Sequence, residues 1–106
     1  MNKTIVMDAA LFELSNKGLK TATTRLGIKN HEIGPAYIKS NIGAEKCIGV
    51  EIISITYKRA YSLTDEDARK EGYCSREVFL EVLKVFYPSM NLYDIVTVIE
   101  YEKKDF

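Results

Sequence analysis

The stretch GLKTATTR, residues 18–25, places three threonines and an alanine between a lysine and an arginine. Threonine is β-branched and the segment is poor in helix formers, so the pattern predicts an extended segment over residues 20–25. Side chains alternate across a strand, so Thr21, Thr23 and Arg25 share one side, while Ala22 and Thr24 share the other. One side of this segment therefore offers two hydroxyls and a guanidinium together.

Lys20 and Thr23 have opposite parity in an ideal strand. They converge on one site only if Lys20 lies in the turn at Gly18 or if a bulge intervenes, and we predict such an irregularity. The chain before it predicts a strand over residues 3–7 and a helix over residues 9–17. Asp8 caps this helix, and Gly18 ends it in a left-handed conformation. We expect its inward residues to be Ala10, Leu11 and Leu14.

The chain after the threonine segment continues with short strands and helices. A polar loop, a short strand over residues 36–39, a turn over 41–46 and a long strand over 47–57 are predicted first. Thr64 is followed by three acidic residues, which is typical of a helix start, and Gly72 ends that helix. Ser75 caps the next helix, which Pro88 stops. Its apolar residues at helical spacing are Phe79, Val82, Leu83 and Phe86. We assign Phe79, Phe86 and Tyr87 to packing.

A closing strand over residues 95–102 completes the pattern. Strands at both ends with helices between them, and no regular alternation of strand and helix, predict an α+β domain on a curled antiparallel sheet. The 106 residues suit one domain, residues 1–106, with one core. The apolar runs are far below the length of about 18 residues that spans a membrane, so we expect a cytoplasmic protein.

Charge and cysteine content exclude several classes of function. The 15 basic and 15 acidic residues cancel, although residues 1–60 hold nine basic against five acidic residues and residues 61–106 hold six against ten. A neutral total argues against long duplex nucleic acid held by phosphate contacts. Cys47, Cys74 and His31 are isolated from one another in the sequence, so no metal site and no cofactor are predicted. We expect both cysteines to be small core residues.

Several motifs occur in order along nearly the whole chain: KTATTR, IGPAYI, LTDEDARKEGY, SREVFLEVLKVFYP and VTVIEYE. In this order and spacing they resemble the ASCH (activating signal cointegrator homology) family. The resemblance implies a PUA-like, mostly antiparallel β-barrel with about three helices packed around it. It also implies a cleft where the threonine segment faces the short acidic helix. Small bacterial members of the family resemble amidohydrolases that remove the acetyl group of N(4)-acetylcytidine.

The resemblance also implies site residues. The lysine, threonine and glutamate of the family's catalytic set fall on Lys20, Thr23 and Glu71, and all three residue types are retained. We expect Thr21, Arg25 and Tyr73 to bind substrate beside them. The family usually has Gly-Asp where this sequence has Gly34-Pro35. If that aspartate anchors an arginine such as Arg25, its absence loosens the contact.

Amide hydrolysis by this set can follow two schemes. In the first, Thr23 is the nucleophile, Lys20 is a base with a lowered pKa, and Glu71 has a raised pKa and protonates the leaving nitrogen. An ionised Glu71 would raise the pKa of Lys20, so these roles require one proton shared between the two. In the second, Glu71 activates water, Lys20 stabilises the oxyanion, and Thr23 only positions the substrate.

A second class of function remains open. Other relatives are regarded as RNA-binding modules, in which Lys20, Arg25 and Lys29 would contact phosphates while a tyrosine stacks on a base. The expected partner is then short single-stranded RNA in place of a small nucleoside.

Overall fold

A computed structural model of the chain describes residues 4–42 and 46–104, so part of the turn predicted over 41–46 lies outside the described residues. The described ranges contain five strands, three α-helices and one short 3-10 turn. In chain order they are β1 (Thr4–Met7), α1 (Ala9–Asn16), β2 (Ala22–Leu26), β3 (Gly34–Ser40), β4 (Cys47–Arg59), η1 (Ala60–Ser62), α2 (Asp65–Lys70), α3 (Arg76–Phe86) and β5 (Ile95–Lys104).

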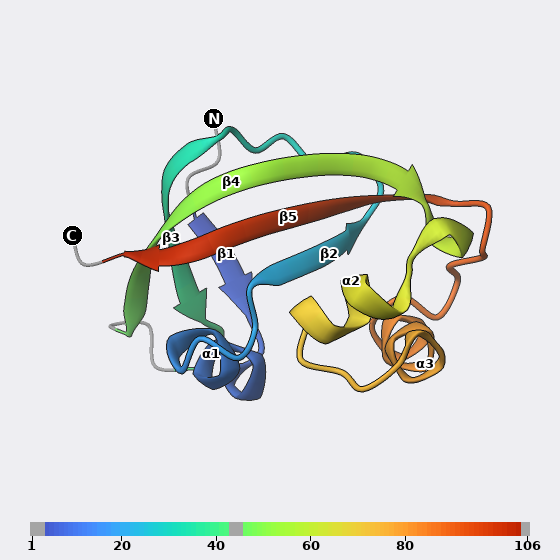
Figure 1. Cartoon of the computed structure of the whole chain (residues 1–106), viewed down its shortest axis with the longest axis horizontal. Helices are drawn as coiled ribbons and strands as arrows, with labels where there is room; N and C mark the ends of the chain where they lie inside the picture. The colour runs from blue at the N-terminus through green and yellow to red at the C-terminus, as the bar shows by residue number, and fades with distance from the viewer. Residues whose placement is uncertain (1–3, 43–45, 105–106) are drawn as a thin grey trace.

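The five strands form one sheet in the order β1-β3-β4-β5-β2. β1 pairs with β3 in parallel, and the other three pairings are antiparallel. The long strands β4 and β5 arch over the helices, with α1 under one end of the arch and α2 and α3 under the other (Figure 1). The register of β4 against β5 shifts between Ile52 and Ser54, as a bulge does, and bulges increase bending. The predicted α+β class with a curled, mostly antiparallel sheet is confirmed, and the sheet closes only as far as a half-barrel.

Helix α1 begins where the sequence predicted. Asp8 is its N-cap, and the carboxylate accepts a 2.9 Å hydrogen bond from the backbone nitrogen of Ala10. The predicted inward face needs correction, however. Phe12 and Ser15 are the buried residues of α1, whereas Ala10 is exposed and Leu11 and Leu14 are only half-buried. The helix is therefore rotated relative to the prediction.

Helices α2 and α3 both begin at a residue whose side chain caps the helix. Thr64 and Asp67 form a reciprocal capping box at the start of α2, and the Ser75 hydroxyl accepts from the nitrogen of Val78 at the start of α3. Phe79 and Leu83 are buried, as predicted for α3. Phe86 was assigned to packing, but its side chain is 51% exposed.

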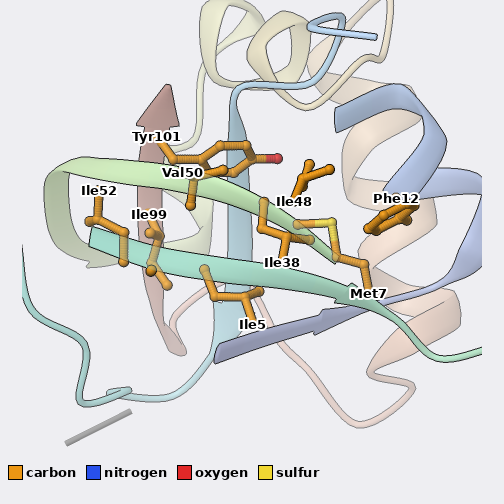
Figure 2. Packing of buried hydrophobic residues seen from close by; sticks show 10 residues of the cluster. Ile5, Met7, Phe12, Ile38, Ile48, Val50, Ile52, Ile99 and Tyr101 are labelled. Carbon is orange, nitrogen blue, oxygen red and sulfur yellow. The ribbon is translucent and has the colours of Figure 1, made fainter. Parts of the chain in front are cut away.

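The core consists of two clusters of buried hydrophobic residues. The first fills the half-barrel between β1, β3, β4, β5 and α1, and Figure 2 shows its side chains gathered between the strands and Phe12 of the helix. The second packs α2 and α3 against the start of β5. Its buried members are Ala60, Leu63, Ala68, Phe79, Leu83, Met90, Val96 and Val98. The cysteines belong to neither cluster: Cys47 and Cys74 are both exposed, which corrects the prediction that they are core residues.

The two edge strands of the sheet, β1 and β2, are joined by a side chain. The guanidinium of Arg25 on β2 donates a 3.0 Å hydrogen bond from Nη2 to the carbonyl oxygen of Val6 on β1. An edge strand presents unpaired backbone groups, and this contact satisfies one of them across the opening of the half-barrel. We call this opening, between β1 and β2, the seam. In residues 4–42 and 46–104 no helix is long and apolar enough to cross a membrane.

Candidate functional site

Lys20 lies in the turn that follows α1, before β2 begins. Gly18 adopts a positive φ of 77°, and the backbone nitrogens of Leu19 and Lys20 then donate to the carbonyl oxygen of Leu14 at 2.9 and 3.2 Å. This arrangement ends the helix and turns the chain sharply. The predicted irregularity at Lys20 is therefore present, and it takes the form of a turn.

The next residue connects this turn to the short helix α2. The backbone nitrogen of Thr21 donates a 2.7 Å hydrogen bond to the carbonyl oxygen of Lys70, and the Thr21 carbonyl accepts from the nitrogen of Tyr101. Lys70 is the last residue of α2, so these bonds bring the end of that helix against the start of β2. Glu71 follows directly and is thereby placed beside Lys20.

Lys20 and Glu71 form a buried ion pair. The Lys20 Nζ lies 2.6 Å from Oε1 of Glu71 and 2.7 Å from the carbonyl oxygen of Ala22. The other carboxylate oxygen, Oε2, accepts a 2.7 Å hydrogen bond from the hydroxyl of Thr24. Lys20 is 2% exposed and Glu71 is 3% exposed. A buried pair of this kind is costly to desolvate, so its presence is weak evidence for a stabilising role.

Burial shifts the pKa of both groups toward the neutral form. Desolvation lowers the pKa of Lys20, although the carboxylate of Glu71 opposes that shift. Desolvation likewise raises the pKa of Glu71, against the opposing effects of Lys20 and Thr24. A pair of ammonium and carboxylate holds the same number of protons as a pair of amine and carboxylic acid. Burial therefore brings these two forms closer in free energy, as proton sharing requires.

Thr23 and Arg25 lie next to the pair but contact each other. The Arg25 Nε donates a 3.3 Å hydrogen bond to the Thr23 hydroxyl, and the same guanidinium reaches Val6 across the seam. Among the described residues, Thr23 has no hydrogen bond to Lys20 or Glu71. Arg25 is thus anchored by a backbone carbonyl and a hydroxyl, so the proline at position 35 does not leave it without a contact.

A small cavity opens beside these side chains. Its volume is about 80 Å³, room for several water molecules or one small planar group. The residues that form its polar side are Asp8, Lys20, Thr23, Thr24, Arg25 and Glu71. Residues from both hydrophobic clusters and their surroundings form the apolar side: Val6, Met7, Leu11, Tyr73, Phe79, Leu83, Phe86 and Tyr87. The cavity therefore lies where the two parts of the core meet.

Two of the three substrate-binding residues predicted from the sequence lie at the cavity, and the third does not. Arg25 and Tyr73 line the cavity, and the Tyr73 ring stacks on Phe79 with centroids 5.6 Å apart. Thr21 is exposed and is not among the lining residues. Its backbone rather than its hydroxyl connects it to the site.

Thr24 is the residue that sequence reasoning missed. Strand alternation predicted that the Thr24 side chain lies on the same side of the strand as Ala22, away from Thr23. It did not predict which residue that side of the strand would contact. Thr24 faces Glu71, which lies 47 positions further along the chain, directly after α2. The sequence did contain one indication of a role for Thr24: it is adjacent to Thr23, and two adjacent threonines place a hydroxyl on each side of a strand. No group of histidine, cysteine or acidic residues suited to holding a metal occurs in the described part of the chain.

Comparison with known proteins bears on the fold. No family model matches the sequence, and no curated protein matches it significantly. Among solved structures, the chain is similar to an ASCH domain from Lactobacillus crispatus JV V101, with a TM-score of 0.80 and 13% identity over 95% of this chain and 79% of that one.

Two further solved structures have the same architecture. The hypothetical protein PH0355 has a TM-score of 0.72 and 22% identity, with 98% of this chain and all of that one covered. The protein EF3133 from Enterococcus faecalis V583 has a TM-score of 0.70 and 14% identity, over 99% of this chain and 82% of that one. Sequence identity this low, over nearly complete chains, establishes a shared fold alone. The chain described here therefore has the ASCH fold.

Proposed function

We propose that this protein hydrolyses a small amide bound in the cavity, with an acylated cytidine such as N(4)-acetylcytidine as the first candidate substrate. The observation that supports this proposal is the buried chain of hydrogen bonds from Lys20 through Glu71 to Thr24 on the polar side of the cavity. Buried groups whose pKa values are shifted in opposite directions, gathered in a cavity, are typical of acid and base catalysis.

Glu71 is the base in this proposal. Its raised pKa brings it nearer to neutral pH, where a general base is most effective, and both of its oxygens are held in place. Lys20 directs one N–H at Glu71 and one at the Ala22 carbonyl, and an ammonium has a third N–H that remains for the oxyanion of the tetrahedral intermediate. Thr23 and Arg25 are proposed to position the substrate from the side of the seam.

The apolar side of the cavity suits the other parts of such a substrate. Tyr73, Phe79 and Phe86 offer ring surface, and Val6 and Leu11 offer aliphatic surface. A short acyl group, or one edge of a pyrimidine ring, is a planar or apolar group that such surfaces bind, and a cavity of about 80 Å³ has room for one of them. The polar side would then meet the amide bond that joins them.

The test is a hydrolysis assay with N(4)-acetylcytidine, followed by the absorbance change of the cytosine ring. Glu71→Gln and Lys20→Met are expected to lower kcat by roughly 100-fold to 1,000-fold, the range for loss of a base or an oxyanion donor. Glu13→Gln, an exposed change on α1, is the matched control for loss of a carboxylate and should retain wild-type rates. Wild-type protein that leaves N(4)-acetylcytidine and related acyl cytidines intact would refute the proposal.

The RNA-binding alternative is less well supported by the geometry. That reading required Lys20 to contact phosphate, but its ammonium is buried and paired with Glu71. The same assay separates the two functions. Salt-sensitive binding of short RNA without turnover would favour the alternative.

A further inference from the structure

Two neighbouring threonines on β2 have hydroxyls with opposite surroundings. The Thr24 hydroxyl donates to Oε2 of Glu71 at 2.7 Å, whereas the Thr23 hydroxyl accepts a 3.3 Å bond from the Nε of Arg25. A hydroxyl becomes a nucleophile only when a base removes its proton, and the base must lie within hydrogen-bond distance of that proton. Thr24 meets this requirement and Thr23 does not.

The groups around Thr24 also occur in the order that nucleophilic catalysis uses. Glu71 contacts the hydroxyl through one oxygen and is fixed by the Lys20 ammonium through the other. Nucleophile, base and a third group that orients the base form the arrangement shared by catalytic triads. Thr24 is only 6% exposed, yet it lines the cavity, so a ligand in the cavity can reach it.

We propose that Thr24, rather than the Thr23 indicated by family resemblance, is the nucleophile that accepts the acyl group. Its Oγ1 bonds to the acyl carbon while its proton passes to Oε2 of Glu71. The bond between acyl carbon and nitrogen then breaks, and the leaving nitrogen takes the proton from Glu71. Water then attacks the acyl carbon of the Thr24 ester, and one of its protons passes through Glu71 to Oγ1. The bond between Oγ1 and the acyl carbon breaks, and the carboxylic acid is released. The assignment of an amide as the substrate rests on the proposed function, whereas the activation of the Thr24 hydroxyl by Glu71 does not.

A reagent that needs no amide specificity tests the hydroxyl directly. Wild-type protein is incubated with para-nitrophenyl acetate, and the acetylated residue is located by peptide mass spectrometry. The expected result is an acetyl ester on Thr24 that disappears in Glu71→Gln and in Thr24→Val. Thr24→Ser keeps the hydroxyl and should keep the label, which distinguishes loss of the nucleophile from loss of folding. Acetylation of Thr23, or of neither threonine, would overturn the proposal.

The adjacent threonine is a matched control, since Thr23→Val removes a hydroxyl from the same strand and cavity. In the N(4)-acetylcytidine assay we expect Thr23→Val to raise KM severalfold with kcat largely retained, and Thr24→Val to lower kcat by at least about 100-fold. The reverse pattern would overturn the proposal even if the amidohydrolase function holds. If wild-type protein labels at Thr24 but hydrolyses no acyl cytidine, the nucleophile stands and only the substrate assignment fails.

Discussion

The ammonium of Lys20 and the carboxylate of Glu71 form a buried pair that carries one titratable proton. In the wild type the folded pair keeps that proton over the neutral range, and the unfolded chain also keeps it, on the lysine. The pair therefore contributes little pH dependence to folding between the ordinary pKa values of 4.5 for Glu71 and 10.5 for Lys20. This balance holds only while both partners are present.

Lys20→Met should make stability depend on pH. Without the cation, desolvation raises the pKa of Glu71 further, so the folded variant keeps a proton that the unfolded chain loses above about pH 4.5. Stability is then greatest at low pH and falls as pH rises, by up to about 1.4 kcal/mol per pH unit until the folded pKa is reached. At pH 8 the loss relative to wild type should be about 3–5 kcal/mol, as for other buried pairs with one partner removed.

Urea unfolding of the variant at pH 5, 6, 7 and 8 measures this slope. Lys20→Met/Glu71→Met, which removes both groups, is the control and should show the pH dependence of the wild type over the same range. A Lys20→Met variant whose deficit is the same at pH 5 and pH 8 would contradict the shifted pKa of Glu71.

For individual residues, the sequence predicted part of the geometry of the site. Parity showed that Lys20 and Thr23 could share a cavity only if Lys20 lay in the turn at Gly18 or if a bulge intervened, and the structure has the turn. Parity could not identify Thr24, because the partner of its hydroxyl is Glu71, the residue that follows α2. Contacts between segments so distant in sequence depend on the packing of the whole sheet, which strand alternation does not encode.

At the level of elements, two helices end at glycines with a positive φ, and both endings shape the site. Gly18 follows α1 with φ 77°, and Gly72 follows α2 with φ 95°. A β-carbon at Gly18 would meet no heavy atom within 4 Å, whereas one at Gly72 would lie 3.3 Å from Cδ1 of Leu14. A side chain at position 18 is therefore disfavoured by the backbone conformation alone, whereas one at position 72 is also disfavoured by its contact with Leu14.

Gly18→Ala and Gly72→Ala form a matched pair of tests. Each should lose about 1–2 kcal/mol of stability from the left-handed backbone, measured by urea unfolding. Gly72→Ala should lose more than Gly18→Ala and should also lower kcat, because the strain falls next to Glu71 and presses on Leu14. Equal stability losses with unaltered activity in Gly72→Ala would show that the α2 ending does not position the carboxylate.

Element boundaries were predicted well where capping residues define them, as at Asp8, Thr64 and Ser75. Helix faces were predicted less well. Helix α1 has only eight residues, and its apolar side chains do not fall on one clear stripe, so packing against the sheet selected Phe12 and Ser15 as the inward residues. Phe86 lies in the last turn of α3, where it lines the cavity and leaves 51% of its side chain exposed.

The whole molecule is a half-barrel whose seam is bridged by Arg25. We predict that Arg25→Met increases hydrogen exchange in β1, because that edge strand loses its contact with β2 while its pairing with β3 remains. The global stability should fall by only about 1.5–3 kcal/mol, the range for a hydrogen bond that involves a charged group.

Hydrogen exchange followed by mass spectrometry, peptide by peptide, measures this effect. Peptides from β4 and β5 in the middle of the sheet are the internal control and should exchange as in the wild type. Uniform acceleration across all strands would mean that Arg25 stabilises the fold globally rather than the seam.

The strand order could not have been read from periodicity. The parallel pairing of β1 with β3 joins Thr4–Met7 to Tyr37–Ser40, and β2 pairs with the distant β5. Both pairings are long-range, so no local signal specifies them. Resemblance to a known family supplied the architecture, while local patterns supplied its segments.

The division of the core into two clusters has a consequence for protein engineering. The Lys20–Glu71 pair lies beside the cavity where the two clusters meet. Hydrophobic replacements of buried ion pairs are often neutral or stabilising. A double replacement of Lys20 and Glu71 by aliphatic residues would extend the apolar interior across this position, so we expect its melting temperature to equal or exceed that of the wild type.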